Sequence, residues 1–85
     1  MQAAEIEAKV RQIIKDNAKL KVPVEEIGLD DSLGDFGISS MNFIKIIVGV
    51  EMEFGFEFNN ETLKFENLDT LRKIVSFIEN QPEVA

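Results

Sequence analysis

Two adjacent serines, Ser39 and Ser40, are the side chains of this sequence best placed to take part in chemistry. They follow Gly37, which favours a turn that a side chain would hinder, and they precede an apolar run typical of a helix. Ser39 is predicted to be the helix N-cap, because its hydroxyl can bond free N–H groups of the first turn. Ser40 is then predicted to lie in that turn and to face outward. A helix N-terminus favours attached or bound phosphate, through its free N–H donors and the positive end of its dipole.

A catalytic role for Ser40 is disfavoured because the sequence offers it no base. The chain has no His and no Cys, which removes the usual partner of a serine nucleophile, Cys or His metal ligands, and disulfides. Lys45 is expected on the opposite side of the helix. We therefore assign no catalytic residue and no metal ligand. Ser40 is instead expected to be a substrate of another enzyme that supplies the base.

The acidic residues of the segment 19–38 raise the alternative of a metal-binding loop. Asp30, Asp31 and Asp35 do not have the spacing of a calcium-binding EF-hand, so a solvated acidic loop is the better interpretation. The net charge is −7, from 16 acidic and 9 basic residues. This charge disfavours nucleic acid as a partner and suits basic protein surfaces, although it also simply keeps a small domain in solution.

Apolar spacing predicts three helices, over residues 3–18, 40–54 and 70–79. The first has one apolar stripe with two favourable i,i+4 ion pairs, Glu5–Lys9 and Glu7–Arg11; the stripe consists of Ala3, Ile6, Val10, Ile13 and Ile14. The segment 19–38 between the first two helices is long for a loop. Recurring apolar side chains should pin it to the core, so we expect it to be ordered.

The second helix carries two apolar stripes and is predicted to end at a Gly55 C-cap. The stripe expected to face the core consists of Phe43, Ile47, Val50 and Phe54. The other stripe consists of Met41, Ile44 and Val48, with Ser40 and Glu51 projecting between the two, and the expected solvent side consists of Asn42, Lys45, Gly49 and Glu53. The second stripe is either a partner-docking surface or a second buried face; its position beside Ser40 favours docking.

The remaining chain is predicted to close the core. Residues 56–58 read as an extended link, followed by a short helical turn over 61–65 that Asn60 caps and in which Leu63 and Phe65 are buried. Asp69 is predicted to cap the last helix, and 81–85 to form a tail. The 85 residues are expected to form a single domain, ordered over about 3–80, with an all-α fold of three to four helices and a long loop between helices 1 and 2. No signal peptide or membrane span is expected.

The segment Asp35–Met41, which reads Asp-Phe-Gly-Ile-Ser-Ser-Met, resembles the modification site of acyl and peptidyl carrier proteins. Their usual pattern is Asp/Glu-Leu-Gly-x-Asp-Ser-Leu, with 4′-phosphopantetheine on the Ser. The register places attachment at Ser40 rather than Ser39. Further similarity covers roughly residues 5–79, including 22–27, 31–33, 53–58 and 68–71.

The resemblance implies a free-standing carrier domain, not an enzyme, that holds an acyl or aminoacyl group as a thioester on 4′-phosphopantetheine derived from coenzyme A. Its implied partners are a phosphopantetheinyl transferase and the enzymes that load and transfer the cargo, in lipid, polyketide or related biosynthesis. A cytoplasmic monomer is expected. The attachment motif then consists of Asp35, Gly37, Ile38, Ser39 and Met41 around Ser40, and the docking residues are Met41, Ile44, Val48 and Glu51.

Three departures from the family pattern leave the pathway open. Ser39 replaces the usual Asp, Met41 replaces the commoner Leu, and Lys45 and Met52 stand where fatty-acid carriers often have acids. The alternatives are a peptidyl or aminoacyl carrier of a nonribosomal-peptide or D-alanine-transfer pathway, and a helical adaptor that is not modified. A metal-binding acidic module and a hydrolase are more distant.

Overall fold

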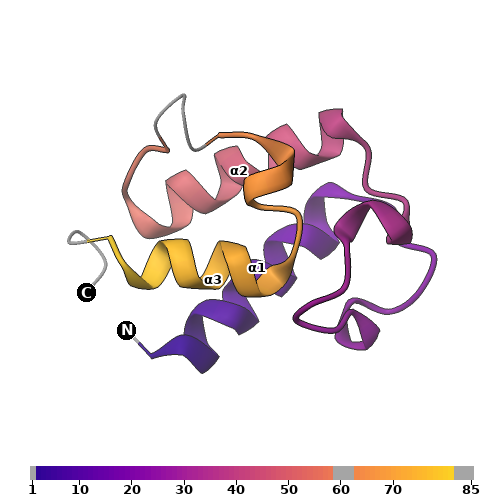
Figure 1. Cartoon of the computed structure of the whole chain (residues 1–85), viewed down its shortest axis with the longest axis horizontal. Coiled ribbons are helices and arrows are strands. Elements are labelled where there is room, and N and C mark those ends of the chain that lie inside the picture. Colours follow the sequence, from indigo (N-terminus) through magenta and orange to yellow (C-terminus); the bar gives the residue numbers. More distant parts are fainter. Residues whose placement is uncertain (1, 59–62, 82–85) are drawn as a thin grey trace.

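The computed structural model describes residues 2–58 and 63–81. Three α-helices form the body of this part of the chain, and α1 packs against both others (Figure 1); they are α1 (Ala3–Asn17), α2 (Ser40–Phe54) and α3 (Leu71–Glu79). The segments that connect the α-helices contain short 3₁₀ turns; they are η1 (Val24–Glu26), η2 (Leu33–Phe36) and η3 (Phe65–Asn67). None of the described residues forms a strand. The prediction of an all-α fold with a long loop between the first two helices is confirmed.

α1 contributes four buried side chains, Ile6, Val10, Ile13 and Ile14, as its apolar spacing predicts. The inclusion of Ala3 in that stripe is wrong: Ala3 is exposed, because the first turn of α1 precedes the buried face that begins at Ile6. The predicted pair Glu7–Arg11 forms, with 3.1 Å between Arg11 Nε and Glu7 Oε2. The predicted pair Glu5–Lys9 does not form. Lys9 Nζ lies instead 3.9 Å from Glu53 Oε2 on α2, so the ammonium group of Lys9 links α1 to α2.

The core face of α2 is the predicted Phe stripe. Phe43, Ile47, Val50 and Phe54 are all buried, together with Ile46, which widens the face. The prediction that Asn42 and Gly49 face solvent is wrong, because this side of α2 lies against α1. A Cβ added to Gly49 would come within 2.8 Å of Ile13 Cγ2. The absence of a side chain at Gly49 therefore lets the two helices approach each other closely.

The loop between α1 and α2 is fixed at several points, as predicted. Val24, Ile27, Leu33 and Ile38 are buried in the core. Arg11 Nη1 reaches from α1 and donates to the backbone carbonyl oxygens of Val24, at 2.7 Å, and Ile27, at 2.8 Å. Because one guanidinium satisfies two carbonyl groups, it holds the first half of the loop against α1.

The second half of the loop is joined to α3 through backbone and acidic side chains. Asp30 accepts two hydrogen bonds from Arg72, Nε–Oδ1 at 2.7 Å and Nη2–Oδ2 at 3.2 Å. This guanidinium holds the pKa of Asp30 below its ordinary value. Asp31 Oδ2 accepts from the backbone N–H of Gly28 at 2.8 Å. No group of three or more acidic side chains within 2–58 and 63–81 is arranged to hold a metal ion, and two of the three aspartates of the loop, Asp30 and Asp31, have structural partners.

Gly55 ends α2 in the left-handed conformation (φ +73°), with its N–H donating to Glu51 O at 2.9 Å, so the predicted C-cap is confirmed. The extended link that follows is also confirmed: Phe56 and Phe58 are buried, and Phe58 stacks on Phe77 of α3 with 4.7 Å between ring centroids. Asn60 and the first residues of the predicted turn 61–65 lie outside the described residues. The prediction that Leu63 is buried is wrong, because Leu63 is exposed. Phe65, the residue at which η3 begins, packs against Phe43 in its place.

α3 begins one residue later than predicted and has a different cap. Thr70 Oγ1 accepts from the N–H of Lys73 at 3.2 Å, so Thr70 is the N-cap and the assignment to Asp69 is wrong. Asp69 accepts instead from Lys73 Nζ at 2.8 Å, and its carbonyl oxygen accepts from the N–H of Leu33 at 2.8 Å. The predicted stripe is buried; it consists of Leu71, Ile74, Val75 and Ile78. Within the described ranges, no helix is long and apolar enough to cross a membrane.

Candidate functional site

A tight turn at Gly37 leads into α2, and it is held by a backbone hydrogen bond on one side and by the buried Ile38 on the other. Gly37 has φ +89°, a left-handed conformation that favours glycine, and its N–H donates to Gly34 O at 3.3 Å. Ile38, next in the chain, is buried and anchors the turn in the core, while Asp35 remains exposed in η2. A side chain at position 37 would strain this turn and displace the serines that follow.

Ser39 is the N-cap of α2, as predicted, and both hydrogen-bonding functions of its hydroxyl are used. Ser39 Oγ accepts from the N–H of Asn42 at 3.2 Å and donates to Asn42 Oδ1 at 2.8 Å. Modification of Ser39 would break both bonds and uncap the helix, which typically costs about 0.5–2 kcal/mol. Ser39 is therefore a positioning residue.

Asn42 is a residue whose role the sequence reasoning missed. Besides its two bonds to Ser39, its Nδ2 donates to the carbonyl oxygen of Asn17, the last residue of α1, at 3.0 Å. Its position three residues after a capping Ser matches the spacing of a capping box, which was the available signal. Asn42 fixes the start of α2 to the end of α1 and so sets the position of Ser40.

Ser40 is the first residue of α2 and is exposed, as predicted. The first N–H groups of a helix have no partner within the helix and carry the positive end of its dipole. An oxygen-linked phosphate on Ser40 would sit at this end. The local geometry thus suits an attached phosphodiester, whereas no His is present in the chain to act as a base for catalysis.

An apolar strip extends from Ser40 along the exposed side of α2. Its members, which we call the α2 strip, are Met41 (72% exposed), Ile44 (57%), Val48 (46%) and Met52 (80%). At about 100° per residue they occupy adjoining positions on one side of the helix. The first three are predicted docking residues. Met52 was not included in the predicted stripe, although its angular position beside Val48 could have indicated it.

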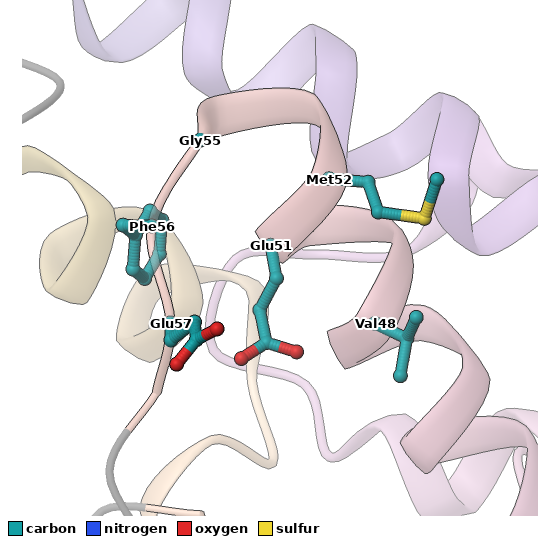
Figure 2. Close-up of a pocket in the computed structure, with 6 residues that line it drawn as sticks. All are labelled: Val48, Glu51, Met52, Gly55, Phe56 and Glu57. Carbon is teal, nitrogen blue, oxygen red and sulfur yellow. The ribbon is translucent and has the colours of Figure 1, made fainter.

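Glu51, the fourth predicted docking residue, borders the strip but has a bond of its own within the protein. Glu51 Oε2 accepts from the backbone N–H of Phe58 at 2.9 Å, so this carboxylate also holds the extended link against α2. Glu51 lines a surface pocket of about 380 Å³, and Figure 2 shows its side chain between Val48 and Met52 of α2 on one side and Phe56 and Glu57 of the link on the other. The structure thus gives Glu51 a structural bond, and its docking role stays a prediction.

Comparisons with known proteins identify the family of the chain. Residues 8–78 match the family model described as "Phosphopantetheine attachment site". The chain is 31% identical over 81 residues to an acyl carrier protein of Coprothermobacter proteolyticus, which covers 94% of each chain. It is 30% identical over 76 residues to acyl carrier protein 2 of Pseudomonas aeruginosa, covering 88% of this chain and 91% of the relative.

A solved structure has the same fold. It is the crystal structure of an engineered Bradyrhizobium japonicum glycine:[carrier protein] ligase complexed with a carrier protein from Agrobacterium tumefaciens and ATP; the TM-score is 0.81, with 24% identity, over 87% of this chain and 96% of that chain. The family match and the acyl carrier protein relatives show that the chain is a carrier protein rather than an enzyme. The chain belongs to the phosphopantetheine attachment family, whose prosthetic group is 4′-phosphopantetheine.

Proposed function

We propose that Ser40 carries the 4′-phosphopantetheine group and that the chain presents an acyl intermediate to partner enzymes of lipid, polyketide or related biosynthesis in the cytoplasm. The observation that carries this proposal is the contrast between the two serines. Ser40 is exposed at the first position of α2, whereas the hydroxyl of Ser39 is engaged by Asn42. When bound, the prosthetic group supplies a thiol that this Cys-free chain lacks.

The chain's own residues hold the attachment point and present it. Gly37 and Ile38 fix the turn, Ser39 and Asn42 cap the helix, and Ser40 Oγ is left free to form a bond to phosphorus. A phosphopantetheinyl transferase that uses coenzyme A would have to supply the base that removes the Ser40 proton. As the bond from Ser40 Oγ to phosphorus forms, the pyrophosphate bond of coenzyme A would break and adenosine 3′,5′-bisphosphate would leave. Tethering the cargo to this small domain would give it a high effective concentration at each enzyme that binds the domain.

The α2 strip is the proposed docking surface of these enzymes, together with Glu51 at its border. Large apolar side chains that remain exposed as one group beside a functional residue are typical of an interaction surface. The strip starts next to Ser40, so an enzyme whose active site reaches Ser40 would cover it.

A second candidate is a carrier of amino acids rather than acyl chains. Lys45 and Met52 stand where fatty-acid carriers often have acidic residues, and both are exposed. The surface beside Ser40 is therefore less acidic than is usual for fatty-acid carriers. The two candidates can be separated with the protein that carries the phosphopantetheine arm but no cargo. It is incubated with either fatty acids or amino acids, each with a matching ATP-dependent ligase, and the intact mass shows which group is attached.

The attachment site is tested by intact-mass measurement after incubation with coenzyme A and a broad-specificity transferase. The wild-type chain should gain the mass of one phosphopantetheinyl group. Ser40→Ala should remain folded and gain none. Ser39→Ala is the matched control: it should lose stability through the missing cap, by about 0.5–2 kcal/mol, and still be modified. Modification of Ser40→Ala at Ser39 would refute the register.

A further inference from the structure

Four lysines gather around the junction of α1, the loop and the start of α2. A surface groove of about 510 Å³ is lined by Lys15 and Lys19 from the end of α1 and the start of the loop, and by Lys45 from α2, with Gly37 and Asn42 between them. A fourth lysine adjoins it, since a Cβ built on Gly37 would lie 3.6 Å from Lys21 Cε. We call Lys15, Lys19, Lys21 and Lys45 the lysine groove.

These charges are not used within the described part of the chain. Every ion pair between its residues involves Lys9, Arg11, Arg72 or Lys73. The one acidic side chain that lines the groove is Asp16, and its Oδ1 accepts from Gln12 Nε2 at 2.9 Å. The groove is thus a locally basic surface on a chain whose net charge is −7.

The groove continues the surface that carries the proposed site. At about 100° per residue, Lys45 follows Met52 and Met41 around α2 on the side away from Ser40. Asn42 and Gly37 line the groove and also fix the start of the helix. A protein that covers the α2 strip as far as Met52 would therefore reach Lys45 at the edge of the groove.

We propose that the lysine groove binds an acidic surface of an enzyme that acts at Ser40, a patch of Asp and Glu side chains that lies beside that enzyme's apolar contact with the α2 strip. This inference rests on the proposed function. The lysines come from three separate segments and are point charges, which suits a broad carboxylate-bearing surface and faster encounter with it. Lysine binds carboxylate and phosphate alike; we favour protein carboxylates because the groove adjoins the apolar α2 strip, which a protein surface would cover and a nucleotide would not.

The test is a titration of the 15N-labelled protein with an octaglutamate peptide at low salt, in which the amide chemical shifts are measured at each peptide concentration. Because the chain as a whole is acidic, an acidic peptide should bind only at a locally basic surface. We expect shifts confined to residues around Lys15, Lys19, Gly37 and Lys45, and we expect them to disappear at about 0.5 M NaCl. Lys45→Glu and Lys19→Glu should each weaken binding roughly two- to tenfold.

Lys64→Glu is the matched control, because it makes the same change in net charge at an exposed lysine outside the groove. Equal weakening by Lys64→Glu and Lys45→Glu, or no localised shift at all, would overturn the proposal. Shifts of the groove with adenosine 3′,5′-bisphosphate but not with the peptide would overturn it in favour of nucleotide phosphates. The intact mass of the same samples after incubation with coenzyme A and transferase reports on Ser40 separately: modification without peptide binding refutes the groove alone, and peptide binding without modification refutes the attachment site alone.

Discussion

A matched pair of substitutions, Val48→Glu and Val50→Glu, separates the docking role of α2 from its structural role. The two valines lie two residues apart on one helix, but Val48 is 46% exposed and Val50 is fully buried. The same change in side chain therefore tests two environments, with helix propensity held constant. We expect Val48→Glu to keep the fold and to weaken partner binding, and Val50→Glu to unfold the protein or nearly so.

The expected magnitudes follow from burial. Fully burying a valine side chain is worth about 1.5–3 kcal/mol, so Val48, which is about half exposed, has roughly half of that to lose. The CH₂ groups of a glutamate would keep part of the contact while its carboxylate reaches water. At position 50 the carboxylate would be buried without a partner, at a cost of several kcal/mol. A domain of this size has only about 5–10 kcal/mol of stability in total.

Thermal unfolding by circular dichroism and the rate of Ser40 loading by an enzyme are the two measurements. Val48→Glu should lower the melting temperature by less than about 10 °C. In an apolar partner groove its unpaired charge should weaken docking by on the order of 1–3 kcal/mol, about ten- to hundredfold. Collapse of the fold in Val48→Glu would show that the strip belongs to the core. An intact fold with an unchanged rate of loading would show that the enzyme recognises only Ser40 and the loop that precedes it.

Two further predictions concern stability. Phe54→Ala should cost about 3–5 kcal/mol, because the ring is buried in the core face of α2; a melting temperature unchanged within error would contradict the assignment of that face. Asp30 has a pKa below its ordinary value because of its hydrogen bonds to Arg72, so the pair stabilises the fold above about pH 4 and this contribution is lost as the pH falls through the lowered pKa. The difference in melting temperature between wild type and Asp30→Asn should therefore shrink on acidification at low salt; a difference independent of pH would refute the contribution of the ion pair.

The faces of α2 show how much of the fold could be predicted from the sequence. The spacing of Phe43, Ile47, Val50 and Phe54 correctly indicates the core, because these large apolar side chains recur with the helical period. Hydrophobicity alone could not show that Asn42 and Gly49 face α1. A polar side chain and a glycine look like a solvent side until the neighbouring helix is in place.

The turn that leads into α2 was predictable for a different reason: its structure depends on local backbone preferences. The left-handed turn at Gly37 and the cap at Ser39 follow from residue types at fixed positions next to a helix. The cap of α3 was misassigned because Asp69 and Thr70 are both good N-caps, and the choice depends on tertiary contacts. Asp69 is held by Leu33 and Lys73 instead. The lysine groove depends on three segments meeting in space, so no local pattern indicates it.

The replacement of the family's usual Asp by Ser39 has a structural consequence that bears on specificity. An Asp at this position would cap the helix and add a negative charge beside Ser40, whereas Ser39 caps the helix without the charge. The lysine groove begins close to position 39, because Gly37 and Asn42 are among the residues that line it. The missing charge and the nearby lysines make this end of α2 less negative, while the fixed start of the helix is kept. Partners that approach with basic residues, as suits an acidic helix, would be repelled from this side of the site, and partners with acidic residues would be favoured.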